Sequence, residues 1–211
     1  MNRARMMTGS HDAETKGEAE LYETPPGAVR ALLAAEPFFL RRQTILEPAC
    51  GPGQLVAALQ AAGHDVTAAD KFDYEARWKS APDTIRTWGR DFLAVPPDTS
   101  CRAVVMNPPY SKADAFIEKA LCCAPRVYAL LERGWAQGEG DARCELADSG
   151  KLVREYAFRE RLEMHRDGFP EELRQSQARK HSWFVFVNGA GRGDGSWITR
   201  RISCIGGQWD A

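Results

Sequence analysis

The sequence lacks the features that would place the protein in a membrane or around a metal ion. None of its apolar runs approaches the length of a membrane span, and the amino terminus has no apolar signal-peptide core. The six cysteines show no C-x-x-C spacing and the four histidines no H-E-x-x-H pair, which argues against a metal site. We therefore expect a cytoplasmic protein with reduced thiols, no membrane contact and no bound metal.

An excess of charge of one sign is also missing. The 28 basic and 29 acidic residues leave a net charge of -1, although residues 151–211 carry 11 basic against 8 acidic groups. So small an excess does not identify a partner. With 44% apolar residues the chain can bury one core. We expect a single domain over residues 21–211, preceded by a polar, aperiodic and flexible leader over residues 1–20.

Short apolar segments alternate with helical patterns from residue 24 onward. Apolar spacing and turn residues predict helices over 25–36, 54–63 and 112–124, and strands over 44–46, 65–69, 85–87, 102–106, 126–131 and 181–187. This alternation predicts an α/β fold with a doubly wound, mostly parallel sheet, in which ligands bind beyond the carboxyl ends of the strands.

Two later segments are harder to interpret. Residues 132–180 are rich in charge and glycine, with one extended stretch over 152–164, and we treat them as a candidate target-recognition insertion. Residues 188–197 contain several glycines and predict a hairpin turn after the last strong strand.

A glycine-containing turn separates the first predicted strand from its helix. In the segment Glu47-Pro48-Ala49-Cys50-Gly51-Pro52-Gly53, the glycines let the backbone approach a ligand that a Cβ atom would obstruct. Val56 holds the third glycine position of a dinucleotide motif, and the lysine of a phosphate loop is missing. The turn therefore favours an adenosine-bearing cofactor other than a dinucleotide or nucleoside triphosphate, although ordinary tight turns also use such glycines.

Acidic residues follow the next two predicted strands. Asp70 ends the second strand, where a carboxylate can accept hydrogen bonds from both hydroxyls of a ribose. Asp91 follows the third strand. The alternatives are structural: Asp70 could cap a helix and Asp91 could be a turn residue.

The fourth predicted strand leads into Asn107-Pro108-Pro109-Tyr110. This tetrapeptide resembles the (Asn/Asp/Ser)-Pro-Pro-(Tyr/Phe) motif of methyltransferases that act on planar amino nitrogens. Its order after the glycine turn and the two acidic residues resembles class I S-adenosylmethionine-dependent methyltransferases, in particular small bacterial and phage DNA adenine methyltransferases. The resemblance covers residues 21–131 and, loosely, the last strand. It implies a seven-stranded Rossmann-like sheet and S-adenosylmethionine as the cofactor.

The resemblance also implies roles for individual residues. It assigns Asp70 to the cofactor ribose and Asp91 to its adenine amino group. The segment from Tyr22 to Pro26 resembles a Thr-Pro element that touches the methionine end of the cofactor, although Thr24 could equally cap a helix with Pro25 at its first position. The expected cofactor-binding residues are Tyr22, Thr24, Pro25, Glu47, Pro48, Ala49, Cys50, Gly51, Gly53, Asp70, Lys71, Asp91 and Phe92.

The expected catalytic residues are Asn107, Pro108, Pro109 and Tyr110. The nitrogen of an aromatic amine has its lone pair delocalised into the ring, so transfer depends on holding that nitrogen in line with the methyl group. The Asn107 side-chain oxygen and the Pro108 carbonyl can each accept one amino hydrogen, because the prolines fix the turn. Tyr110 would stack on the target ring, unless it serves only as a core residue.

The substrate is less well specified than the chemistry. We expect adenine in DNA; arginines of residues 132–180 could contact its phosphates, although most scattered arginines are ordinary surface charges. Adenine or guanine in RNA comes second, and glutamine side chains of proteins are a further enzymatic alternative. A different class of function is a partner subunit that binds S-adenosylmethionine without turnover. The sequence does not predict an oligomeric state.

Overall fold

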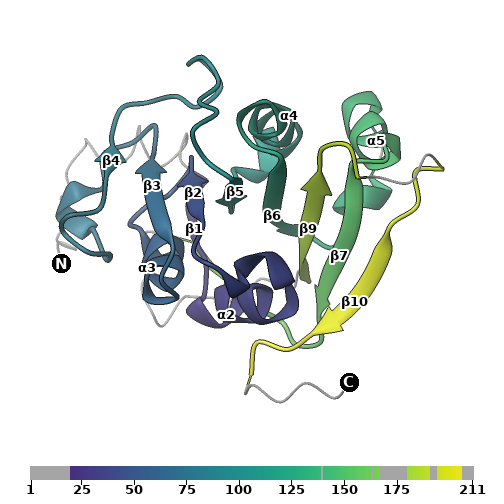
Figure 1. Ribbon diagram of the computed structural model, residues 1–211, viewed down its shortest axis with the longest axis horizontal. Helices are drawn as coiled ribbons and strands as arrows, with labels where there is room; N and C mark the ends of the chain where they lie inside the picture. Colours follow the sequence, from purple (N-terminus) through teal and green to yellow (C-terminus); the bar gives the residue numbers. More distant parts are fainter. Residues whose placement is uncertain (1–19, 139, 163, 167–179, 191–193, 206–211) are drawn as a thin grey trace, which may run out of the picture.

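The computed structural model describes residues 20–138, 140–162, 164–166, 180–190 and 194–205. Eight strands form one sheet in the order β10-β7-β9-β6-β5-β2-β3-β4 (Figure 1). Their bounds are β2 Thr44–Glu47, β3 Asp65–Ala69, β4 Arg86–Thr87, β5 Ala103–Met106, β6 Arg126–Glu132, β7 Leu152–Phe158, β9 His181–Val187 and β10 Ile198–Ile202. All neighbours are parallel except that β9 runs antiparallel to both β6 and β7. The predicted α/β class with a mostly parallel sheet is confirmed.

The sheet has eight strands where seven were expected. The additional strand is β10, which pairs in parallel with β7 from Ile198 opposite Arg154 to Ile202 opposite Phe158. The predicted hairpin turn over residues 188–197 is therefore wrong, because a hairpin would have placed β10 beside β9. Both edges of β9 are already occupied by β6 and β7, so the chain crosses to the outer edge of the sheet.

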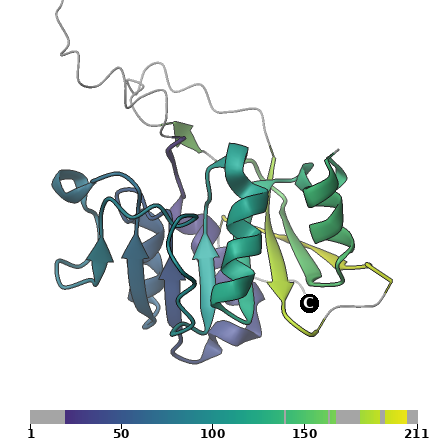
Figure 2. The same cartoon turned by 90° about the horizontal axis from the view of Figure 1, so that it is seen from above.

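Helices cover both faces of the sheet. Figure 2 shows α4 (Ala113–Cys123) and α5 (Asp141–Asp148) on one face, with α2 (Pro26–Ala35) and α3 (Gln54–Ala61) on the other. Alternate residues of each strand point to opposite faces, so two apolar clusters form. Val105, Leu130 and Trp183 pack with α2 and α3, whereas Met106 and Phe184 pack with α4 and α5.

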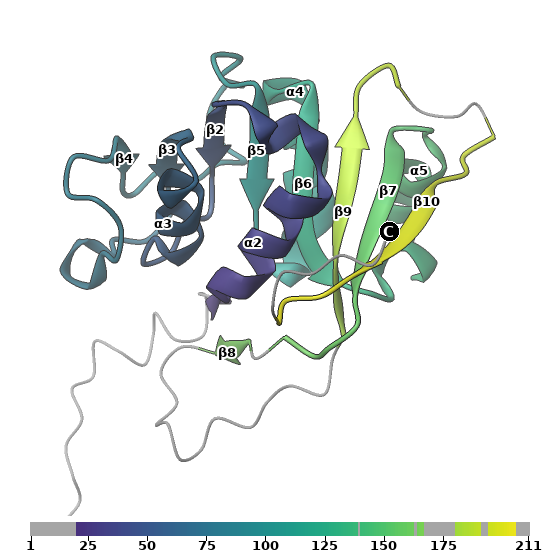
Figure 3. The same cartoon turned by 60° about the horizontal axis from the view of Figure 1, so that its bottom comes forward.

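A small second sheet lies beside the main one. β1 (Tyr22–Glu23) pairs antiparallel with β8 (His165–Arg166), and β8 appears near the start of α2 in Figure 3. The described residues also form four single-turn 3-10 helices, namely η1 Pro37–Leu40, η2 Glu75–Arg77, η3 Tyr110–Lys112 and η4 Trp135–Gln137. In the part of the chain that the structure describes, no helix is both long and apolar enough to cross a membrane.

Part of the candidate target-recognition segment, residues 132–180, belongs to the core, and a role of the segment in target recognition stays a prediction. Its helix α5 was not predicted, and its strand β7 lies inside the sheet between β9 and β10. Between β7 and β9, residue 163 and residues 167–179 lie outside the described ranges. The predicted leader, residues 1–20, lies outside them too, except for Glu20.

Candidate active site

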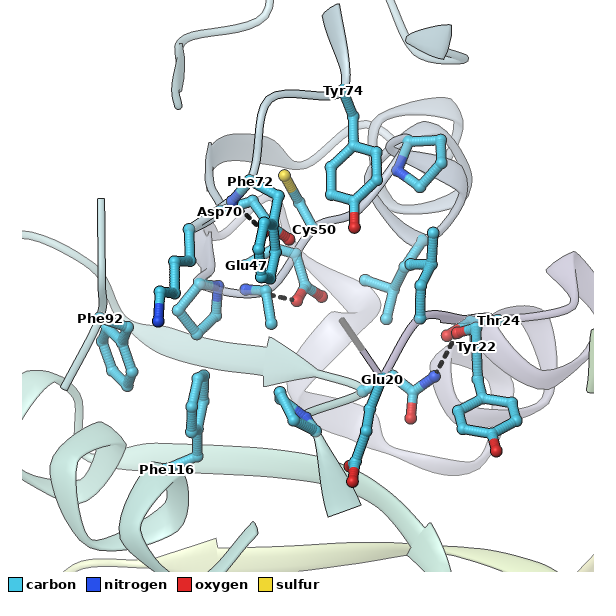
Figure 4. A pocket seen from close by; sticks show the side chains of 18 of the residues that line it. Glu20, Tyr22, Thr24, Glu47, Cys50, Asp70, Phe72, Tyr74, Phe92 and Phe116 are labelled. Carbon is cyan, nitrogen blue, oxygen red and sulfur yellow. Dashed lines mark hydrogen bonds between the residues drawn. The ribbon is translucent and has the colours of Figure 1, made fainter. Parts of the chain in front are cut away.

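A cavity of about 350 Å³ opens where the carboxyl ends of β2, β3 and β5 meet (Figure 4). Strands β2, β3 and β5 are parallel neighbours, so the turns that follow them lie at the same edge of the sheet. Most of the predicted cofactor-binding residues line the cavity: Tyr22, Thr24, Glu47, Pro48, Ala49, Cys50, Asp70, Lys71, Asp91 and Phe92. Of the catalytic residues predicted from the motif, Asn107 and Pro109 line it.

Close packing explains the two glycines of the turn after β2. Gly51 and Gly53 have φ angles of 49° and 88°, in the left-handed region that disfavours residues with a Cβ atom. A Cβ atom on Gly53 would lie 2.6 Å from the Trp78 ring, and one on Gly51 would lie 2.7 Å from Leu21. Gly51 and Gly53 do not line the cavity themselves; they shape the backbone that does.

Asp70 connects the turn after β2 to the end of β3. Its Oδ2 accepts a hydrogen bond from the Gly51 amide at 2.9 Å, and its Oδ1 accepts one from the Phe72 amide at 2.9 Å. Burial raises the pKa of Asp70, and the backbone hydrogen bonds oppose that shift. The helix-cap alternative is wrong, because the next helical turn, η2, begins only at Glu75. Each carboxylate oxygen can still accept a further hydrogen bond from a ligand.

Glu47 is a second buried carboxyl group beside the cavity. It is 1% exposed, and its Oε1 accepts a hydrogen bond from the Ala49 amide at 3.2 Å. Among the described residues its Oε2 has no hydrogen-bond partner. Burial, together with the nearby charge of Asp70, raises the pKa of Glu47 well above its usual value. A ligand that donates a hydrogen bond or carries positive charge would satisfy this oxygen.

The far wall of the cavity combines one carboxylate with aromatic rings. The Oδ1 of Asp91 accepts a hydrogen bond from the Leu93 amide at 3.0 Å, as a turn residue would, and Lys71 Nζ lies 3.8 Å from its Oδ2. Phe92 packs against Phe116 with ring centroids 5.3 Å apart. Figure 4 shows these two rings at one end of the cavity, with Phe72 and Tyr74 nearer Cys50. Burial raises the pKa of the Cys50 thiol, which keeps it uncharged at neutral pH.

The chain segment before α2 closes the opposite side. Thr24 is 4% exposed and lines the cavity, but Pro25 does not. The capping alternative for Thr24 is wrong: α2 is capped by Pro25, begins at Pro26, and has no side-chain cap hydrogen bond. Thr24 therefore borders the cavity without capping α2.

Asn107 lies between this segment and the cavity. Its Nδ2 donates a hydrogen bond to the Tyr22 carbonyl at 2.7 Å, as the dashed line in Figure 4 shows. Its buried Oδ1 has no hydrogen-bond partner in the described part of the chain. Pro109 borders the cavity, while Pro108 is buried and does not. The motif thus contains a buried hydrogen-bond acceptor without a described partner. Such an acceptor costs stability unless a ligand supplies the donor.

Tyr110 does not line the cavity. Its ring stacks on that of Tyr22, with centroids 5.3 Å apart and planes 20° apart, and its hydroxyl lies 3.0 Å from Nε2 of His181. Tyr22 therefore covers one face of the ring that was expected to stack on the target. Its role toward a substrate stays a prediction.

Sequence reasoning missed a second group of lining residues. Phe72 and Lys112 each lie two positions beyond a predicted site residue, so their proximity was a usable signal. Glu20 lies two positions before Tyr22, and its Oε2 accepts a hydrogen bond from the Ser111 amide at 3.0 Å. The remaining members of this group are Leu21, Glu23, Pro52, Gln54, Leu55, Tyr74, Ser111 and Phe116. Within the described ranges, no three His, Cys, Asp or Glu side chains gather closely enough to hold a metal ion.

Comparison with solved structures identifies the fold. No protein-family model matches the chain, and no curated protein matches it significantly. A methyltransferase subunit of a type I restriction-modification system from Streptococcus thermophilus aligns over 86% of this chain and 47% of its own, with a TM-score of 0.62 and 13% identity. This chain thus spans about half the length of that subunit.

Two smaller proteins align over most of their length. A proposed RNA methyltransferase from Pyrococcus horikoshii aligns over 80% of this chain and 87% of its own, with a TM-score of 0.59 and 15% identity. The magnesium protoporphyrin IX methyltransferase of Synechocystis, solved with bound S-adenosylmethionine, aligns over 77% and 78%, with a TM-score of 0.52 and 18% identity. The chain has the Rossmann-like fold of class I S-adenosylmethionine-dependent methyltransferases.

Proposed function

We propose that this protein transfers a methyl group from S-adenosylmethionine to the exocyclic amino group of adenine in DNA. Asn107 is the observation that carries the proposal. Its Oδ1 is a buried acceptor with no hydrogen-bond partner among the described residues, and it borders a cavity of about 350 Å³. An amino group placed there would satisfy this oxygen.

The lining residues fit the three chemical parts of S-adenosylmethionine. Asp70 can accept hydrogen bonds from ribose hydroxyls, Asp91 from the adenine amino group, and the unpartnered oxygen of Glu47 from the ammonium group. Phe92 supplies apolar wall area for the adenine ring. A cavity of this size is within the range of small-molecule sites. When bound, the cofactor supplies a methyl group on a sulfonium sulfur.

The residues after β5 act on the acceptor nitrogen by positioning it. Asn107 Oδ1 and the Pro108 carbonyl each accept one amino hydrogen, which draws the lone pair out of the ring and toward the methyl group. Bound S-adenosylmethionine would supply the methyl carbon and keep the sulfur as a neutral thioether, while the nitrogen, held by Asn107 and the Pro108 carbonyl, would release one proton to solvent. Tyr110 contributes a stacking surface, worth roughly 1–3 kcal/mol per base.

Adenine in DNA is the substrate that these features support best. The planar amino group suits the motif, and a base flipped from a duplex can reach a recessed site. The structural neighbours include a methyltransferase subunit of a restriction-modification system and a proposed RNA methyltransferase, so RNA belongs in the same experiment.

The test uses purified protein with labelled S-adenosylmethionine and, in parallel, unmethylated duplex DNA, RNA and a protein mixture. We expect label in DNA, recovered as 6-methyladenine, and its loss in Asn107→Ala. Asn188→Ala is a matched control, because the Asn188 side chain donates to the Leu121 carbonyl at 2.8 Å and does not line the cavity. Label in RNA or protein alone would overturn the DNA substrate. Cofactor binding without transfer to any acceptor would favour a non-catalytic binding subunit.

A further inference from the structure

His181 is an unusual residue for its position. It begins β9, whose seven residues are all buried and otherwise apolar except for Ser182, and it is itself 1% exposed. Alternation along the strand puts it on the α2 face with Trp183 and Val185, while Ser182 points to the opposite face. A buried imidazole needs polar partners, so its surroundings indicate its role.

One of those partners belongs to the proposed catalytic motif. Nε2 of His181 lies 3.0 Å from the Tyr110 hydroxyl, and the two ring centroids are 6.0 Å apart. Tyr110 also stacks on Tyr22. One contact holds the ring by its face and the other by its hydroxyl, so together they restrict both its tilt and its rotation.

The two contacts come from distant parts of the chain. Tyr110 and His181 are 71 residues apart. Tyr22, the other partner of the Tyr110 ring, is as distant: it lies 85 residues before Asn107, whose side chain also binds it. The antiparallel course of β9 places its first residue at the edge of the sheet where the parallel strands end. Because of the sheet topology, His181 therefore lies beside the residues after β5, Asn107 to Tyr110, which form the acceptor end of the proposed site.

We propose that His181 is a positioning residue for the acceptor, which it serves by fixing the Tyr110 ring through the Tyr110 hydroxyl. The inference rests on the proposed transfer to a planar amino group. Loss of the contact leaves Tyr110 able to rotate, so a planar substrate is stacked less firmly. Cofactor binding is unaffected, because neither His181 nor Tyr110 lines the cavity.

The test compares four single variants and the double variant His181→Leu/Tyr110→Phe by the KM for the acceptor, the kcat and the cofactor Kd. His181→Leu removes the imidazole, and Tyr110→Phe removes the hydroxyl from the other side of the same contact. His181→Gln keeps a polar group of similar reach. Ser182→Ala is the matched control, because Ser182 is a buried neighbour whose hydroxyl donates to Glu155 on the opposite face.

We expect His181→Leu and Tyr110→Phe each to raise the acceptor KM by about 3- to 10-fold, the range that one lost hydrogen bond supports. The double variant should be no worse than either single one, and His181→Gln should restore most of the loss. The cofactor Kd should stay unchanged throughout. If His181→Leu fails to fold, Tyr110→Phe and His181→Gln still decide the question.

A second readout follows the stacked ring directly. An acceptor oligonucleotide with 2-aminopurine at the target position reports base stacking through its fluorescence, whether or not transfer occurs. Wild-type protein should quench a flipped base more than Tyr110→Phe or His181→Leu does. If the wild type is active and both His181→Leu and Tyr110→Phe match Ser182→Ala in the kinetic constants and in the fluorescence, the inference is wrong. The proposed function would then still stand. A wild type that neither modifies nor binds any acceptor overturns the proposed function, and this inference with it.

Discussion

The turn after β2 and the turn after β5 end parallel strands at the same edge of the sheet, but different forces hold them. After β2, left-handed glycines and hydrogen bonds from backbone amides to Asp70 fix the main chain. After β5, two consecutive prolines offer no amide hydrogen, and the side chain of Asn107 forms the link to Tyr22. The turn after β2, together with Asp70, forms the cofactor end of the proposed site, and the turn after β5 forms its acceptor end. The cofactor end should therefore be sensitive to an added Cβ atom, and the acceptor end to the loss of a side chain.

The largest expected effect is at the acceptor end. Asn107→Ala removes the unpartnered acceptor and should lower kcat/KM by about 10²–10³-fold, the usual effect of removing one aligned polar group from an active site. Cofactor affinity, measured by calorimetry, should change little. Asn107→Asp keeps an acceptor oxygen but loses the donor to Tyr22, so it should retain more activity than Asn107→Ala. Equal kcat/KM for Asn107→Ala and wild type would contradict this assignment.

The cofactor end gives the next largest effect. Gly53→Ala should lower the free energy of unfolding by about 2–4 kcal/mol, because left-handed strain adds to the clash with Trp78. Gly63 offers a matched control: its φ angle is also 88°, yet nothing lies within 4 Å of an added Cβ atom. Gly63→Ala should cost only the strain, about 1–2 kcal/mol. Urea unfolding of both variants measures the difference, and equal losses would show that Trp78 simply moves aside.

Glu47 should show that a group which favours cofactor binding can lower the stability of the fold. Burial raises the pKa of Glu47 above its usual 4.5, so the folded protein holds its proton more tightly than the unfolded chain does. The contribution of this group to stability is complete below pH 4.5 and is lost as the pH rises through the higher, folded pKa.

Glu47→Gln should remove that loss and raise the free energy of unfolding at neutral pH, because the amide has no proton to release. Cofactor affinity should fall, because the amide carries no charge to pair with an ammonium group. Denaturation curves from pH 4 to pH 8 test the first point and calorimetry the second. A variant that is less stable than wild type at neutral pH would mean that a partner already compensates the charge.

The cofactor end was largely predictable from the sequence because its parts are local. The motif from Glu47 to Gly53 and the acid Asp70 are close in sequence, and strand ends follow from the alternation of apolar segments. Trp78 could not be predicted, because its contact with Gly53 depends on how the chain after β3 folds back.

The acceptor end was only half predictable. Asn107 and Pro109 line the cavity as expected, but the stacking of Tyr110 on Tyr22 was not anticipated, and the role of Tyr110 toward a target ring stays a prediction. The apolar pattern of residues 181–187 predicted a core strand, and this prediction is correct. Because such a strand needs no functional explanation, the pattern did not indicate the role that we propose for its first residue, His181. Strand β10 was missed for a similar reason: four of its five residues are exposed, so it lacks the apolar alternation that marks a strand.

The smallest expected effect concerns a long-range contact at the cofactor end. Lys79 Nζ donates to both carboxylate oxygens of Glu23, at 2.6 and 2.8 Å, and joins the chain after β3 to β1 beside the cavity. The Lys79 side chain is about half exposed, so the pair should stabilise the fold by only about 0.2–1 kcal/mol. Lys79→Met should therefore weaken cofactor binding by less than about fivefold.

Measurements at different ionic strengths test whether the ion pair itself causes this effect. The difference between wild type and Lys79→Met should shrink as ionic strength rises, because exposed charges are screened. Arg42→Met is the matched control, since Arg42 and Asp65 form an exposed ion pair at the opposite end of β3, where no residue lines the cavity. It should leave cofactor affinity unchanged at every salt concentration. A loss of cofactor affinity in Lys79→Met that does not depend on salt would mean that the aliphatic part of the lysine side chain, rather than the ion pair, shapes the cavity. The cofactor end would then depend on side chains, as the acceptor end does.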